Sequence, residues 1–182
     1  FRWRGYTIEL IDFAQQAGVT TFVTLGALMA DVAHSRSIPV SATSEDDVTM
    51  HRFDLEPSGY EGPTGIIGVL ADAATQAGLT TISCWAAVPH YAGHSPSPKA
   101  TLALLNRLAQ LLDLPIDTGD LPAEAQTWEG NIDVLAESDE EIAEYVDALE
   151  KAQDTAELPE ASGDAIAREF ERYLRNRPPE KP

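Results

Sequence analysis

The sequence is poor in cysteine, in basic residues and in long apolar runs. Its one cysteine, Cys84, excludes a disulfide within the chain and a cysteine-based metal site. No apolar run reaches the roughly 20 residues that a helix needs to cross a bilayer, and the first residues lack the basic and apolar regions of a secretory signal. The four histidines do not have the spacing of a metal site. We therefore expect a cytoplasmic protein without metal or other cofactor.

Basic residues are outnumbered, with 12 Lys and Arg against 30 Asp and Glu, so the formal net charge is −18. Lys and Arg supply most of the affinity for nucleic acids and anionic membranes, so neither is expected as the main partner. The excess of acidic over basic residues lies mainly in residues 113–164, whose net charge is −16. Residues 1–112 carry a net charge of −4, and residues 165–182 carry +2. This acidic stretch is interpreted as a solvated helix face; the alternative is a platform for a basic partner protein.

Segments typical of helices and strands alternate along residues 1–112. Spacings of three or four residues predict helices, and runs of β-branched and aromatic residues predict buried strands. The predicted helices cover residues 3–17, 65–76 and 98–112, the first with the apolar stripe Trp3, Tyr6, Leu10, Phe13 and Ala17, and the predicted strands cover residues 19–25, 38–43 and 79–88. The alternation predicts an α/β domain with a mostly parallel sheet. Three strands are few, so we expect further strands upstream of Phe1.

From residue 121 onward the pattern is helical throughout. The first apolar stripe consists of Leu121, Trp128, Ile132 and Leu135. A second helix is expected to begin at Ser138, with Glu141 completing a capping box, and a third stripe covers residues 166–174. Short connections favour an antiparallel pair of helices. The predicted organisation is an α/β core at 1–112, an acidic helical part at 113–177 and a disordered tail at 178–182.

Three loops could together form a ligand site. Two of them follow predicted strands, and ligands of open α/β sheets bind beyond the carboxyl ends of the strands. The third precedes a helix, whose N-terminal amides favour anions. The candidate ligand-crevice residues are His34, Arg36, Glu61, Thr64, Gly65, His90 and Tyr91.

Each candidate also has a structural interpretation. The loop at 61–65 lacks the pattern of a phosphate-binding loop and is typical of a tight turn, His34 with Arg36 is typical of a surface pair, and His90 with Tyr91 can shape a turn. In an enzyme, His90 would be the general acid or base, Arg36 or His34 would hold an anion, and the Thr64–Gly65 amides would cradle an oxyanion or a phosphate. No dedicated nucleophile accompanies them.

Three stretches together resemble one family. They are YEGPTGIIGVL at residues 60–70, WAAVPHY at residues 85–91 and SPSPKA at residues 95–100. In combination they resemble the PAC2 family, the proteasome assembly chaperone 2-like proteins, and among these the bacterial, actinobacterial-type members. The resemblance implies a three-layer α/β core similar to the phosphorylase/hydrolase-like fold, homo-oligomers such as trimers, and proteasome-related partners.

Two functions follow as hypotheses. The first is a non-enzymatic, oligomeric, assembly-chaperone-like protein that interacts with other proteins. The alternative is a small-molecule or anion-binding enzyme of the nucleoside phosphorylase or hydrolase type, acting in the strand-end crevice. Relatives that dock on proteasome rings often end in a hydrophobic residue, Tyr and one further residue. This sequence ends in Pro-Glu-Lys-Pro at residues 179–182 and therefore departs from that pattern.

Overall fold

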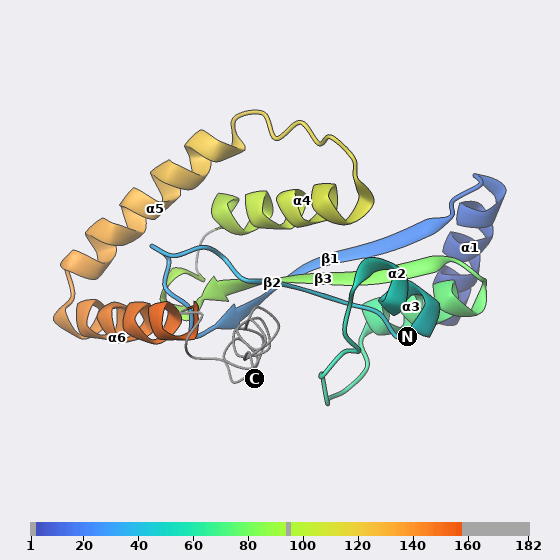
Figure 1. The fold of residues 1–182 in the computed structure, drawn as a ribbon, viewed down its shortest axis with the longest axis horizontal. Coiled ribbons are helices and arrows are strands. Elements are labelled where there is room, and N and C mark those ends of the chain that lie inside the picture. The colour runs from blue at the N-terminus through green and yellow to red at the C-terminus, as the bar shows by residue number, and fades with distance from the viewer. Residues whose placement is uncertain (1–2, 94–95, 158–182) are drawn as a thin grey trace, which may run out of the picture.

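A computed structural model describes residues 3–93 and 96–157 of the chain (Figure 1). These residues form three strands and six α-helices, with one short 3-10 helix. In chain order they are α1 (Trp3–Gln16), β1 (Thr21–Ala30), β2 (Val40–Thr43), α2 (Asp47–Phe53), α3 (Ile66–Gln76), β3 (Thr80–Pro89), the 3-10 helix η1 (His90–Ala92), α4 (Pro98–Leu112), α5 (Leu121–Glu137) and α6 (Glu140–Glu157). The predicted helix at 166–174 and the predicted tail at 178–182 lie outside the described residues.

The three strands form one mixed sheet in the order β1-β3-β2. β1 runs parallel to β3 over ten residue pairs, from Thr21 beside Thr80 to Ala30 beside Pro89. β2 runs antiparallel to β3. A parallel β2 would need a crossover of a dozen residues or more, and the chain between Ala30 and Val40 is too short for one. The alternating pattern predicted a mostly parallel sheet, but in the described sheet one strand pair is parallel and the other is antiparallel.

The predicted strand at residues 19–25 stops before Gly26, whereas β1 continues through Gly26 to Ala30. A Cβ atom on Gly26 would lie 2.6 Å from Cζ3 of the Trp85 ring, on the neighbouring strand β3. Gly26 thus lets an indole lie against the backbone of β1, which is one of the uses of glycine inside a strand. The Trp85 indole N–H donates a 3.0 Å hydrogen bond to Ser83 Oγ, so the ring is also held from its polar side.

One face of the sheet supports α2 and α4. Ile82 and Cys84 of β3, both fully buried, pack with Leu55 and with Leu104 of α4, and Ala86 packs with Ala100. Cys84 is buried, as the sequence predicted. The Ser97 side chain caps α4 as expected, because it accepts a hydrogen bond from the Ala100 N–H.

The first helix buries a different side from the one predicted. Thr7, Ile11 and Ala14 are its buried residues, and Ile11 and Ala14 pack with Ala74 of α3 and Leu79. Tyr6 and Phe13 are 55% and 67% exposed. The short side chains of Ala14 and Ala74 permit close packing between the helices, which the bulky aromatic stripe does not. Tyr6 and Phe13 of the predicted stripe therefore lie at the surface of the described structure.

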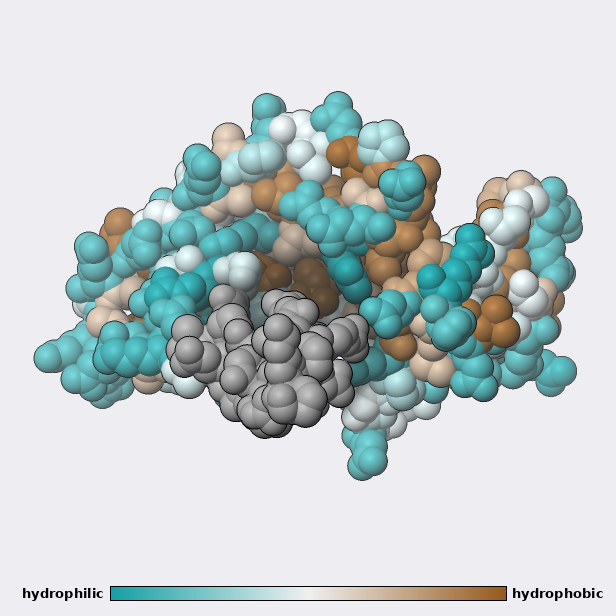
Figure 2. Space-filling view, in the orientation of Figure 1, coloured by the Kyte–Doolittle hydropathy of each residue, from teal (hydrophilic) through white to brown (hydrophobic). Residues whose placement is uncertain are grey.

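Within the described residues, the acidic part contains α5 and α6, which diverge from their connection at residues 138–139 (Figure 1). Trp128 and Ile132 of α5 are buried and pack against Ala92 and Tyr91. Asp139 caps α6, in place of the predicted Ser138, by accepting from the Glu141 N–H. Hydrophilic residues cover most of this region in Figure 2. Among the described helices, none is long and apolar enough to cross a membrane.

Substitution Gly26→Ala tests the contact between the indole ring and the β1 backbone. The added methyl group would overlap the Trp85 ring, so we expect the free energy of unfolding to fall by about 1–3 kcal/mol. The matched control is Gly5→Ala in α1, where a Cβ meets nothing within 4 Å and where alanine favours the helix by up to about 1 kcal/mol. Urea denaturation of both variants measures the difference; equal stability would contradict this account of Gly26.

Candidate functional site

The parallel strands β1 and β3 end side by side, and their following segments therefore meet. β1 ends at Ala30 opposite Pro89, the last residue of β3. His34 lies in the loop after β1, and Tyr91 lies in η1 directly after β3. The two rings meet edge to face with their centroids 5.6 Å apart. The structure thus brings these two predicted residues into contact, as expected for segments that follow neighbouring parallel strands.

His34 is only 2% exposed, yet both of its ring nitrogens have partners. Nδ1 lies 2.8 Å from the Tyr91 hydroxyl, and Nε2 lies 2.9 Å from Oδ1 of Asp133 on α5. The same Tyr91 oxygen accepts a 2.9 Å hydrogen bond from the His34 backbone N–H. A neutral imidazole with its proton on Nε2 satisfies all of these contacts, since it accepts from Tyr91 and donates to Asp133.

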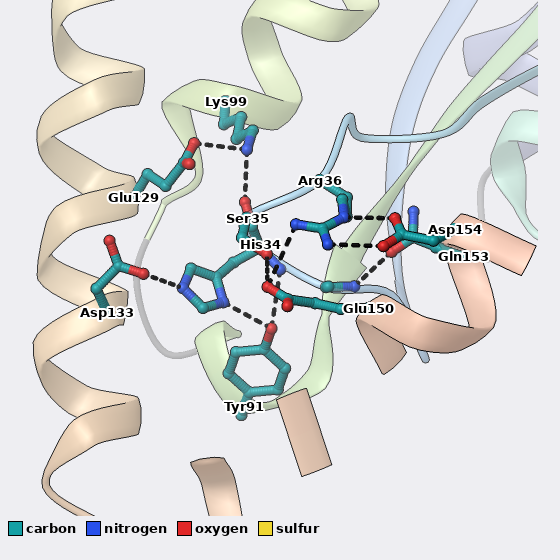
Figure 3. Close-up of polar contacts among 11 residues, drawn as sticks. His34, Ser35, Arg36, Tyr91, Lys99, Glu129, Asp133, Glu150, Gln153 and Asp154 are labelled. Carbon is teal, nitrogen blue, oxygen red and sulfur yellow. Dashed lines mark hydrogen bonds and ion pairs between the residues drawn. The ribbon is translucent and has the colours of Figure 1, made fainter. Parts of the chain in front are cut away.

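His34 belongs to a larger set of polar contacts between the α/β core and the acidic helices, which we call the polar junction (Figure 3). From the core it contains His34, Ser35, Arg36, Tyr91 and Lys99, and from α5 and α6 it contains Glu129, Asp133, Glu150, Gln153 and Asp154. The core contributes mainly hydrogen-bond donors and the helices contribute acceptors. The junction therefore joins complementary surfaces of one chain.

Carboxylates of the chain itself hold both cations of the junction. Arg36 forms a bidentate pair with Asp154, with Nε to Oδ1 at 2.7 Å and Nη2 to Oδ2 at 2.8 Å. Lys99 Nζ lies 2.6 Å from Glu129 Oε2 and also donates to the His34 carbonyl oxygen at 2.5 Å. Bidentate arginine–carboxylate pairs are among the stronger polar contacts in proteins. The proposed anion clamp at Arg36 is thus already occupied by an internal anion.

The environment shifts the acidity of three groups around the junction. Burial raises the pKa of the Tyr91 phenol, an effect that its hydrogen bond from the His34 N–H partly offsets. The hydrogen bonds from Arg36 lower the pKa of Asp154. The hydrogen bond that Tyr145 of α6 donates to Asp31 raises the pKa of the Tyr145 phenol. The structure therefore favours a neutral Tyr91 and a charged Asp154.

The remaining predicted residues lie elsewhere. Glu61, Thr64 and Gly65 are exposed in the loop before α3, and no hydrogen bond or ion pair described in the structure joins them to the junction. His90 is adjacent to Tyr91 but is about half exposed, with Nε2 3.5 Å from Asp31 Oδ1.

A cavity of about 220 Å³ lies beside His34. Its wall is formed by His34, Asp133, Ala136, Glu137, Ala143, Val146, Asp147 and Glu150. Apart from His34, no residue predicted for the ligand crevice lines it. The described structure therefore brings His34, Arg36 and Tyr91 together, but it does not assemble the full predicted crevice.

Sequence reasoning missed the acidic side of the junction. Glu129 and Asp133 are four residues apart on α5, as are Glu150 and Asp154 on α6, so each pair lies on one face of its helix. This spacing is the signal that could have identified them. It is also found in the exposed acidic residues of the same helices, which is why spacing alone does not separate the two groups.

The comparisons with known proteins agree with the resemblance in sequence. The PAC2 family model matches residues 1–136. A PAC2 family protein from Streptomyces avermitilis has 51% sequence identity and a TM-score of 0.73, over 80% of this chain and 61% of that one. A proteasome-assembly chaperone homologue from Mycobacterium tuberculosis has 45% identity and a TM-score of 0.70, over 80% of this chain and 62% of that one.

A more distant structure supports the fold alone. An archaeal homologue of proteasome-assembly chaperone from Pyrococcus furiosus, PbaA, has 18% identity and a TM-score of 0.57, over 76% of this chain and 62% of that one. The chain spans less than two thirds of the length of all three structures. No curated protein matches it.

Substitution Tyr91→Phe tests the buried part of the junction. It keeps the ring but removes the oxygen that the His34 N–H donates to, and an unsatisfied buried donor costs about 1–3 kcal/mol. The matched control is Tyr60→Phe, because Tyr60 is 71% exposed. We expect the loss of unfolding free energy in urea only for Tyr91→Phe. Equal stabilities of the two variants would contradict the assigned hydrogen bonds.

Proposed function

Because the chain belongs to the PAC2 family, we propose that it is a non-enzymatic, proteasome-assembly-chaperone-like protein that binds other proteins and assembles with copies of itself. The observation that carries the proposal is the 45% identity with a proteasome-assembly chaperone homologue over 80% of the chain. Proteasome-related proteins are the partners that this likeness favours. The proposal includes a cytoplasmic location and a homo-oligomer such as a trimer.

The state of the strand-end residues supports a binding role over a catalytic one. His34 and Tyr91 are engaged with each other and with Asp133, and Arg36 and Lys99 are engaged with carboxylates of α5 and α6. A general base or an anion clamp must face its substrate. These groups instead hold two parts of one chain together, which is a structural use of their charges.

The alternative is an anion-binding enzyme of the nucleoside phosphorylase or hydrolase type. The observation in its favour is the position of His34 and Tyr91, because they lie where ligands of open α/β sheets bind. Against it, no hydrogen bond or ion pair described in the structure joins Thr64 or Gly65 to the junction, so the residues assigned to the enzyme are not all in contact.

Affinity capture with native mass spectrometry tests the proposed function. The tagged chain is used as bait in a lysate of a proteasome-containing bacterium, with an acidic protein of similar size and pI as the control for charge. We expect native mass spectrometry to show an oligomer, and we expect capture to enrich proteasome-related proteins relative to the control. A monomer that enriches none of them would overturn the proposal.

A thermal-shift panel of phosphate, nucleosides and nucleotides distinguishes the proposed binding protein from the alternative, an anion-binding enzyme. A ligand present at 100 times its dissociation constant stabilises a protein by about 2.7 kcal/mol. The proposed binding role predicts no shift across the panel. A reproducible shift that disappears in the variant Arg36→Gln would instead favour the anion-binding enzyme.

A further inference from the structure

A groove of about 410 Å³ lies between the start of α4 and the first part of α5. Its apolar wall is formed by Pro96, Pro98, Ala123 and Trp128. The volume is in the range of pockets that hold a ligand. No residue that lines the groove belongs to the polar junction. The groove is therefore a second site, separate from the strand ends.

Trp128 brings to this groove a hydrogen-bond donor without an acceptor. The residue is 6% exposed, and it packs with Ala92 and Ile132 on one side while its ring also lines the groove. Its indole nitrogen Nε1 is buried and has no hydrogen-bond partner among the described residues. An indole N–H can only donate, and a buried donor without an acceptor destabilises a fold. A ligand that brings an acceptor oxygen would remove this cost.

The charge of the groove favours a basic ligand. Glu124 is the one charged residue of its lining, and it is exposed. α5 contains four acidic residues and no Lys or Arg. Two of the four, Glu129 and Asp133, already bond to the core. Electrostatic complementarity therefore calls for Lys or Arg beside Glu124.

The apolar wall favours an extended segment that contains proline. Proline-rich segments dock in grooves lined by aromatic residues, because their polyproline II conformation exists before binding and little entropy is lost. This conformation has no internal hydrogen bonds, so its carbonyl oxygens can accept from an indole N–H. The ligand that fits the wall, the donor and the charge is therefore an extended segment with proline and with Lys or Arg.

The sequence contains such a segment at residues 175–182, outside the described residues. It reads RNRPPEKP, with three prolines and with three basic residues against one acidic residue. No other stretch of eight residues in the sequence contains three prolines. The tail predicted from the sequence thus has the chemistry that the groove requires.

The chain is long enough for this segment to reach its own groove. α6 ends at Glu157. The chain from Glu157 to Pro178 spans up to about 70 Å when it is extended. α6, the longest described helix, is about 27 Å long. The connection is thus more than twice as long as any described helix, so docking within one chain is possible.

We propose that residues 175–182 dock in the groove between α4 and α5 of their own chain. A backbone carbonyl oxygen of the segment accepts from Trp128 Nε1, prolines lie against the apolar wall, and a basic side chain lies beside Glu124. The groove is then occupied by the chain itself, and a proline-rich basic segment of another protein has to compete for it.

NMR of the full chain labelled with ¹⁵N tests the docking, because each of the three tryptophans gives its own indole N–H signal. In the variant Pro178→Ser/Pro179→Ser we expect the Trp128 signal to move upfield, since its N–H loses the acceptor. The Trp85 indole donates to Ser83 and should keep its position, which shows that the fold is intact. The control Pro57→Ser changes an exposed proline elsewhere and should leave both signals in place.

A peptide of residues 175–182 provides the matching gain of signal. Added to the proline variant at a few millimolar, it matches the effective concentration of a flexibly tethered segment. We expect it to return the Trp128 signal to its position in the unmodified chain. Labelled unmodified chain, refolded with an excess of the unlabelled proline variant, should keep its Trp128 signal, because each chain supplies its own segment.

The variants Glu124→Gln and Glu137→Gln test the basic contact. Each removes one negative charge from α5, but Glu137 lines the cavity beside His34 and not this groove. Loss of an exposed ion pair weakens an interaction by up to about fivefold, so we expect a partial upfield shift of the Trp128 signal for Glu124→Gln alone.

Four results would overturn the docking of residues 175–182. They are an unchanged Trp128 signal in the proline variant, no response of that variant to the peptide, loss of the signal in the mixed sample, and equal effects of the two glutamate variants.

Discussion

Ten residue pairs hold β1 parallel to β3, and the contact between His34 and Tyr91 at the centre of the polar junction depends on this register. Because both strands end at the same level, the loop after β1 and the 3-10 helix after β3 start side by side. His34 and Tyr91 then lie within hydrogen-bond distance. Asp133 reaches His34 from α5, and this contact ties the acidic helices to the sheet. A shift in register would separate all of these groups.

Patterns along the sequence predicted the elements better than their contacts. Alternating helices and strands, the Ser97 cap and the buried Cys84 follow from local rules, and the structure has all of them. The sequence pattern ends the first strand at Gly26, but β1 continues to Ala30. Local rules miss this because the indole ring that lies on Gly26 belongs to a residue 59 positions later. The aromatic stripe of α1 was expected inside, but the helix packs through its small residues. Both errors concern packing between distant segments.

The candidate site was predicted only in part. Strand-end reasoning brought His34 and Tyr91 together because it depends on topology alone. It could not foresee that carboxylates of α5 and α6 would occupy Arg36 and Lys99, since the acidic residues of those helices look alike in sequence. Most of them are exposed, as a solvated face predicts, but four of them, Glu129, Asp133, Glu150 and Asp154, also bond to the core. Some of the carboxylates behind the net charge of −18 therefore hold the helices to the core, and the others face solvent.

The central claim is that the bond between His34 and Asp133 couples the acidic helices to the α/β core. A double-mutant cycle of His34→Ala and Asp133→Ala, measured by urea denaturation, tests this coupling most directly. Groups in direct contact show coupling energies of about 0.5–3 kcal/mol, and we expect a value near the lower end because Asp133 is 55% exposed. Additive effects of the two substitutions, with no coupling energy, would contradict the claim.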